Sequence, residues 1–102
     1  DVPTPPQNVR AKEVNKNHVV LIWDVPEKDG GAPITGYFIE RKDVKKSAWI
    51  SGGETKANVL ECKVEKLTEG NDYLFNVFAE NEIGRSEPGS TEPIKARLPF
   101  GE

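Results

Sequence analysis

The stretch LTEGNDYLFNVFAEN, residues 67–81, decides the fold of this chain. Side chains of one parity in its second half are all apolar or aromatic: Tyr73, Phe75, Val77 and Ala79. Because successive side chains of a strand point to opposite faces, this alternation predicts an antiparallel strand with one buried face. Gly70, in the turn before it, is free to adopt positive φ. Leu67, this turn and the tyrosine together predict a tyrosine corner, in which the Tyr73 hydroxyl bonds to the backbone upstream of the turn.

The length and composition indicate one globular domain. The chain has 102 residues, of which 35% are hydrophobic and 30% are charged, a balance that favours a buried core over disorder. The net charge of −3 gives no basis for binding nucleic acid. No apolar run approaches the ~20 residues of a membrane span. We therefore expect neither nucleic acid nor a membrane as a partner.

Cysteine usage and the asparagine contexts favour a reducing compartment. Cys62 is the single cysteine of the chain, so no internal disulfide can form. No asparagine is followed two positions later by serine or threonine, which is the acceptor pattern for N-glycosylation. Both observations favour an intracellular protein.

The remaining patterns predict an all-β fold, because turn signals recur roughly every ten residues and no helical period is present. We expect a seven-stranded antiparallel β-sandwich with strands at residues 7–14, 18–24, 34–42, 47–51, 57–67, 73–80 and 90–98. Gly52 and Gly53 are expected to end the fourth strand, and Pro93 fits only an edge or a bulge. Strand reversals of this kind place the two termini at opposite poles.

The proline content predicts the domain limits. Residues 1–6 are expected to form a Pro-rich linker with few hydrogen bonds, residues 7–98 the domain, and residues 99–102 the start of a second linker. The predicted structural core consists of inward side chains and one turn glycine: Trp23, Tyr37, Ile39, Trp49, Val64, Leu67, Gly70, Tyr73, Phe75 and Val77.

No catalytic, metal or cofactor site is expected. His18 has the outward parity of its strand, with Val20 and Ile22, whereas Cys62 has an inward parity, so the two cannot form a nucleophile pair. Metal sites need several converging ligands, and one histidine with one buried cysteine does not supply them. Gly30 is followed by a second glycine, but no helix N-terminus follows to complete a phosphate loop. We predict that the domain is not an enzyme and holds no cofactor.

Three sets of outward side chains are candidates for a contact surface. Phe38 on the third strand lies near Leu74 and Phe78 on the sixth if those strands are neighbours, and the three can form one patch. Val20 and Ile22 form a smaller set on the opposite sheet. Charges gather in a basic hairpin and in an acidic stretch of the last two strands: Arg41, Lys42, Lys45 and Lys46, and Glu80, Glu82, Glu87 and Glu92. Each set has two interpretations, an ordinary solvated surface or a contact with a partner.

The pattern as a whole resembles the fibronectin type III family over essentially the full chain. Trp23 falls on the second strand and there is no cysteine pair, which distinguishes the chain from immunoglobulin domains. The matching positions are Trp23, Tyr37 and the series Leu67…Gly70…Tyr73-x-Phe75-x-Val77-x-Ala79-x-Asn81. The segments WDVPEKDGGAPITGY (residues 23–37) and AENEIGRSEP (residues 79–88), with Glu40-Arg41 before Trp49, are similar to the modules of giant muscle proteins. Cys62 departs from that pattern, which usually has a larger apolar residue there.

This resemblance implies a structural function. Such modules alternate with immunoglobulin domains in tandem arrays along the thick filament, in the A-band of the sarcomere, within the cytoplasm. The implied partners are neighbouring immunoglobulin and fibronectin III domains of the same chain and, weakly and multivalently, the myosin tail or other thick-filament proteins. The isolated domain is expected to be monomeric, and the parent chain can carry a kinase elsewhere. The alternative is a ligand-binding module of a cell-surface receptor or adhesion protein, which the missing Arg-Gly-Asp motif, glycosylation sites and extra cysteines disfavour.

Overall fold

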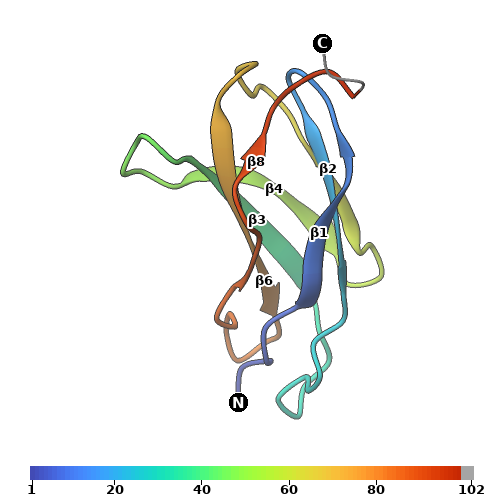
Figure 1. Cartoon of the computed structure of the whole chain (residues 1–102). Helices are drawn as coiled ribbons and strands as arrows, with labels where there is room; N and C mark the ends of the chain where they lie inside the picture. Colours follow the sequence, from blue (N-terminus) through green and yellow to red (C-terminus); the bar gives the residue numbers. More distant parts are fainter. Residues whose placement is uncertain (100–102) are drawn as a thin grey trace.

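The computed structural model describes residues 1–99, and within them all regular structure is β (Figure 1). The strands are β1 (Gln7–Val14), β2 (Val19–Asp24), β3 (Gly36–Asp43), β4 (Ile50–Lys56), β5 (Glu61–Val64), β6 (Asp72–Glu80), β7 (Gly89–Ser90) and β8 (Ile94–Lys95). They form a three-stranded sheet, β1-β2-β5, and a five-stranded sheet, β4-β3-β6-β7, with β8 also paired to β6. All pairings are antiparallel. The predicted sandwich is therefore confirmed.

The last predicted strand is divided into two short pieces. β7 and β8 both pair with β6, and the chain between them contains Pro93, which has no N–H to donate to a sheet. The predicted seventh strand thus corresponds to β7 and β8 together. Figure 1 shows the first residues and the last described residues at opposite ends of the sandwich, as predicted.

The core lies between the two sheets and follows the predicted parities. β6 alternates strictly between buried and half-buried side chains, and the rings of Trp23 and Tyr37 pack with centroids 5.4 Å apart. The buried apolar cluster consists of Val19, Leu21, Trp23, Tyr37, Ile39, Val64, Leu67, Tyr73, Phe75, Val77, Ala79 and Ala96. Every apolar residue of the predicted core except Trp49 is in this cluster.

The placement of Trp49 in the core is wrong. Its surface is 38% exposed, because β4 begins only at Ile50 and the preceding residues belong to a hairpin end that projects from the side of the sandwich (Figure 1). Period-two alternation predicts the side of the sheet to which each side chain points. It does not predict where the hairpin extends beyond the opposite sheet, so that an inward side chain is no longer covered.

The expectation that glycines end the fourth strand is also wrong, because β4 continues through Gly52 and Gly53 to Lys56. The β3–β4 register shifts at this point, which is the signature of a β-bulge, and Gly53 has φ 138°. A Cβ atom on Gly52 would lie 3.3 Å from side-chain atoms of both Ile39 and Val64. The glycines therefore allow the edge strand to approach the core closely instead of turning away.

The fifth strand is shorter than predicted. Regular pairing covers only Glu61–Val64 rather than residues 57–67. Residues 57–58 form a turn that is closed by the Val59 N–H, which donates to the Lys56 carbonyl at 3.0 Å. Cys62 lies opposite Leu21 and is half-buried, and burial raises the pKa of its thiol.

The predicted tyrosine corner is present. The Thr68 N–H donates to the Tyr73 hydroxyl oxygen at 2.8 Å, and Gly70 is exposed with φ 92°. The Gly70 N–H donates to the Ala96 carbonyl at 2.8 Å, and the Ala96 N–H donates to the Asn71 carbonyl at 3.0 Å. The turn therefore connects the end of the three-stranded sheet to the chain that follows β8.

The Pro-rich segment at residues 1–6 differs from the free, poorly bonded linker that its composition predicts. Pro3 and Pro6 are buried, and the Thr4 N–H donates to the Lys28 carbonyl at 3.0 Å while the Thr4 hydroxyl accepts from the Lys28 N–H at 2.9 Å. Gly30, with φ 78°, leaves the space that the segment occupies, since a Cβ there would lie 2.2 Å from the Asp1 carbonyl oxygen. We call residues 1–6 the docked leader.

Asn81 joins the docked leader to two loops. Its amide nitrogen donates to the carbonyls of Asp1 (3.0 Å) and Asp29 (2.8 Å). Its amide oxygen accepts from the N–H groups of Ile83 (2.9 Å) and Gly84 (3.1 Å). Because the residue is 6% exposed, these bonds are made in a poorly hydrated site.

Tyr73→Phe should lower the free energy of unfolding by about 1–3 kcal/mol, because the Thr68 N–H loses its partner while the ring packing is kept. Chemical denaturation of the two proteins measures the difference. A midpoint unchanged within error would contradict the assignment of this hydroxyl to a corner bond.

Asn81→Ala should destabilise the domain by at least about 2 kcal/mol, since it leaves backbone groups of the leader and of both loops without partners. Asn81→Asp is the companion variant, because it keeps the oxygen acceptor but turns a carboxylate oxygen toward the Asp1 and Asp29 carbonyls, so it should destabilise the domain as well. If both variants melt like the original chain, the leader does not depend on this side chain.

Candidate interaction surface

The outer face of the five-stranded sheet carries four of the predicted contact residues: Phe38, Lys42, Leu74 and Phe78. The β3–β6 register places Phe38 opposite Phe78, Glu40 opposite Asn76, and Lys42 opposite Leu74. These residues are all half-buried. Successive rows on one face lie about 6–7 Å apart along the strands. The face is therefore built of three rows of different chemistry.

The first row is an aromatic pair covered by an arginine. The rings of Phe38 and Phe78 have centroids 6.2 Å apart, and the Arg85 guanidinium carbon lies 4.3 Å from the Phe38 centroid and 5.5 Å from that of Phe78. Arg85 Nε also donates to a Glu80 carboxylate oxygen at 2.7 Å. A cation over an aromatic face contributes about 0.5–1 kcal/mol at an exposed site. Arg85 of the same domain therefore covers the rings of Phe38 and Phe78.

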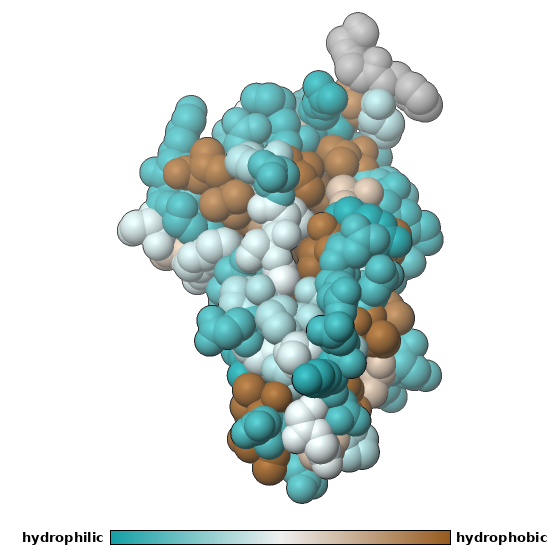
Figure 2. Space-filling view, turned by 60° about the horizontal axis from the view of Figure 1, so that its bottom comes forward, coloured by the Kyte–Doolittle hydropathy of each residue, from teal (hydrophilic) through white to brown (hydrophobic). Residues whose placement is uncertain are grey.

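The middle row is polar and separates the apolar ones. Asn76 Nδ2 donates to Glu40 Oε1 at 3.3 Å, and the Ser90 hydroxyl donates to Asn76 Oδ1 at 2.6 Å. Leu74 consequently lies about 13 Å along β6 from Phe78. Phe38, Leu74 and Phe78 therefore do not form one patch, and the interpretation as an ordinary surface applies to this set. Figure 2 likewise shows apolar residues in separate patches among hydrophilic ones.

The third row lies at the end of the β3–β4 hairpin. The β3–β4 pairing ends with Glu40 opposite Ser51 and Arg41 opposite Ile50, and Trp49 directly precedes β4 in the hairpin end. Val44 and Trp49 are each 38% exposed, and Lys45 and Lys46 are exposed in the turn. We call this set the hairpin surface: Lys42, Val44, Lys45, Lys46, Trp49 and Leu74.

The basic character of the hairpin surface comes from its lysines and not from Arg41. The Arg41 guanidinium donates to the carbonyls of Glu65 (3.1 Å) and Lys66 (3.3 Å), so it braces the two sheets against each other. Lys42, Lys45 and Lys46 form no ion pair within residues 1–99. Sequence reasoning found these lysines, but it missed Trp49 as their neighbour.

The outer face of the other sheet is framed by charge. Val20 lies opposite Glu13 on β1 and Lys63 on β5, and Ile22 lies opposite Arg10 and Glu61. Lys12 pairs with Glu61 at 3.1 Å, and Arg10 with Asp24 at 3.6 Å. Val20 and Ile22 are half-buried, so this second apolar set is small and enclosed by ion pairs.

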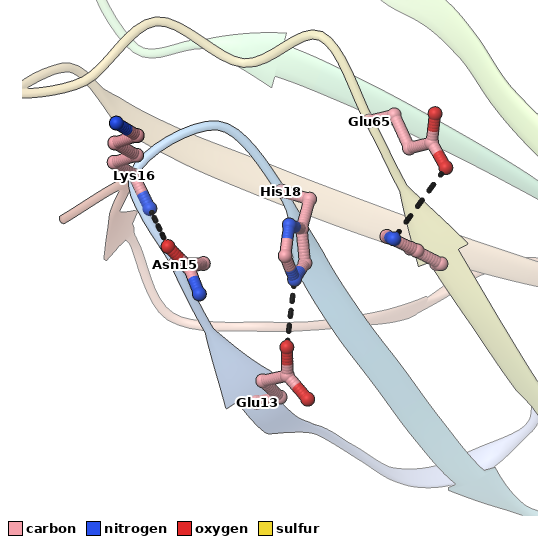
Figure 3. Close-up of polar contacts among 6 residues, drawn as sticks. Glu13, Asn15, Lys16, His18 and Glu65 are labelled. Atoms are coloured by element: carbon pink, nitrogen blue, oxygen red, sulfur yellow. Dashed lines mark hydrogen bonds and ion pairs between the residues drawn. The ribbon is translucent and has the colours of Figure 1, made fainter. Parts of the chain in front are cut away.

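His18 lies at the end of this sheet, as Figure 3 shows, with its Nε2 2.7 Å from Glu13 Oε2. The hydrogen bond from the imidazole holds the pKa of the Glu13 carboxyl below its usual value. Lys63 and Glu65, which line the same surface hollow as His18, form a separate, looser ion pair at 3.8 Å. The histidine is thus occupied on the outer face, while Cys62 packs inward.

Residues 1–99 contain no group of three or more His, Cys, Asp or Glu side chains that could hold a metal ion. In the same part of the chain, no helix is long and apolar enough to cross a membrane.

His18→Ala should raise the pKa of Glu13 toward its ordinary value, because the imidazole bond favours the carboxylate. In the original chain, a lowered folded-state pKa means that Glu13 adds stability above the carboxyl's unfolded pKa and loses it as the pH falls through the folded value. NMR titration of the Glu13 side chain measures this directly. Identical titration curves in the two proteins would show that the contact is not formed in solution.

The sequence of this chain matches a known protein family and several known proteins. The family described as "Fibronectin type III domain" matches residues 4–96. The chain is 44% identical over 97 residues to titin of Drosophila melanogaster, covering 93% of this chain and a share of that protein that rounds to 0%. It is 40% identical over 103 residues to the fast-type myosin-binding protein C of Gallus gallus, covering 100% of this chain and 9% of the relative.

A solved structure agrees with both sequence matches. The crystal structure of domains A168–A170 from titin superposes with a TM-score of 0.87 at 34% identity, covering 95% of this chain and 33% of that one. The chain therefore spans only a small part of its sarcomeric relatives. The family model that covers nearly all of the domain, together with the two antiparallel sheets, shows that this chain belongs to the fibronectin type III family, as a non-catalytic structural module related to those of titin and myosin-binding protein C.

Proposed function

We propose that this module is one bead of a tandem array of fibronectin III and immunoglobulin domains in a giant sarcomeric protein of the titin type. In this proposal the array lies in the A-band, within the cytoplasm, and contributes to thick-filament assembly and length. The observation that carries the proposal is the match to a single domain of the three-domain titin structure, with 33% of that chain covered.

The geometry of the domain suits a connection in series. The molecule measures 47 × 26 × 18 Å, and its two ends lie at opposite poles (Figure 1). Because the docked leader is bonded to the loops at its pole, a preceding domain would be attached at a fixed position rather than through a loose tether. Neighbouring domains of the same chain are therefore the first partners in the proposal.

Contact with the myosin tail is the second part of the proposal. Lys42, Lys45 and Lys46 form no ion pair within the described residues, and exposed charges of this kind attract an oppositely charged rod weakly and in a salt-dependent manner. Weak contacts become significant when several modules of one chain bind along the same filament, because later contacts are intramolecular.

A tandem of this module with its neighbours in the parent chain should bind myosin tail fragments at low salt and lose affinity at physiological salt, whereas the single domain should bind barely. Co-sedimentation with the fragments measures both. Lys45→Glu with Lys46→Glu should weaken the tandem, and Lys16→Glu, an exposed lysine in the β1–β2 turn, is the matched control. If neither form binds, the module is a spacer whose contribution is length alone.

A further inference from the structure

We propose that the hairpin surface is a docking site for an acidic amphipathic helix of another protein, with Trp49 as its central apolar anchor. This inference deepens the proposed function, because it names the surface chemistry that a filament partner would present. The proposed site includes Trp49, which the sequence analysis placed in the core. It excludes Phe38 and Phe78, which the sequence analysis counted among the contact residues.

The first argument is the exposure of Trp49. Trp23, the other tryptophan, is 2% exposed, whereas Trp49 is 38% exposed. It lies one residue before β4, in the same hairpin end as Lys42 and the exposed Val44, and Lys42 pairs with Leu74 on β6. Tryptophan is the residue type most enriched among interface residues that dominate binding energy, especially where smaller apolar groups surround it. At the hairpin end, Trp49 lies near smaller apolar side chains and remains accessible to a partner.

The second argument is the unbalanced charge around that tryptophan. Residues 41–49 hold four basic side chains and one carboxylate, Asp43, which accepts from the Lys45 N–H (2.9 Å) and from Asn71 Nδ2 (3.0 Å) and forms no ion pair with the lysines. The lysines of the hairpin surface thus remain positive on a domain whose net charge is −3. A partner that complements them must carry carboxylates beside its own apolar side chains.

The third argument identifies the form of the partner. β4 is an edge strand, but the bulge at Gly52 and Gly53 breaks its regular register, and bulges of this kind hinder the addition of another strand. The bulge therefore favours a partner that contacts the domain through its side chains rather than by backbone pairing. A helix presents glutamates and leucines together on one face at spacings of three and four residues, with its own backbone groups already bonded.

The aromatic pair does not compete for this partner. Phe38 and Phe78 are covered by Arg85, which is itself paired with Glu80. The polar row of Glu40 and Asn76 separates the pair from Leu74. Binding there would require displacing an internal ion pair, whereas the hairpin surface needs no rearrangement.

The first experiment uses tryptophan fluorescence of the 102-residue chain. The probe is a synthetic helical peptide with a leucine stripe on one face and glutamates beside it, and its control is an isomer of the same composition with the leucines dispersed. We expect the amphipathic peptide to shift Trp49 emission to the blue and to protect it from acrylamide, and the dispersed isomer to do neither. Equal binding of the two peptides would overturn the proposal, since it would show charge attraction alone.

Variants locate the site by calorimetric titration with the same peptide. Trp49→Ala, and separately Lys45→Glu with Lys46→Glu, should weaken binding at least tenfold. Ile83→Ala is the matched apolar control, because Ile83 is 59% exposed on the β6–β7 loop at the leader's pole, and Lys16→Glu is the charge control. Both controls should bind like the original chain. Unchanged binding by Trp49→Ala, with its melting temperature intact, would also overturn the proposal.

Myosin tail fragments separate this inference from the function it rests on. If the tandem binds the fragments equally well with and without Trp49→Ala, the docking site is wrong and the scaffold function stands. If the original tandem does not bind the fragments while the single chain binds the amphipathic peptide through Trp49, the proposed contact with myosin is wrong and the docking site stands.

Discussion

The hydrogen bond from the Thr68 N–H to the Tyr73 hydroxyl is the constraint on which the rest of this domain depends. It fixes the point at which the chain leaves the three-stranded sheet and enters β6. β6 then pairs with β3, β7 and β8, so the register of the larger sheet is set by where this strand begins. Each row of the outer face, from the hairpin surface to the aromatic pair, inherits its position from that register.

The same sheet shows how a domain of this family can divide stability and contact between its two faces. Its inner face contributes Tyr37, Ile39, Phe75 and Val77 to the core, whereas its outer face carries apolar groups in two isolated rows. The row of Phe38 and Phe78 is covered by Arg85, which in turn pairs with Glu80. The other is the hairpin surface, where Trp49 is exposed and the lysines lack acidic partners. A bound partner could bury this apolar surface and pair with these charges.

Local alternation was sufficient to predict most of the core, because burial in a sheet is a property of parity, and the order of Leu67, Gly70 and Tyr73 was sufficient to predict the corner. Alternation failed where the outcome depends on residues distant in sequence. The glycines of β4 form a bulge rather than a turn, with Gly52 against Ile39 and Val64 and Gly53 against Cys62. Trp49 is exposed because the hairpin extends beyond the sandwich. The Arg85 cover over Phe38 depends on a loop more than forty positions away and has no local signal, so the contact surface was recovered only in part.

The docked leader gives the domain a defined path for tension. A pull applied through residues 1–6 acts first on the bonds that Thr4 makes with Lys28 and that Asn81 makes with Asp1, and only afterwards on the ladder between β1 and β2. Peeling the leader away lengthens the chain by a few residues while the sandwich stays intact. A series of such modules would therefore yield slightly and reversibly under load before any of them unfolds.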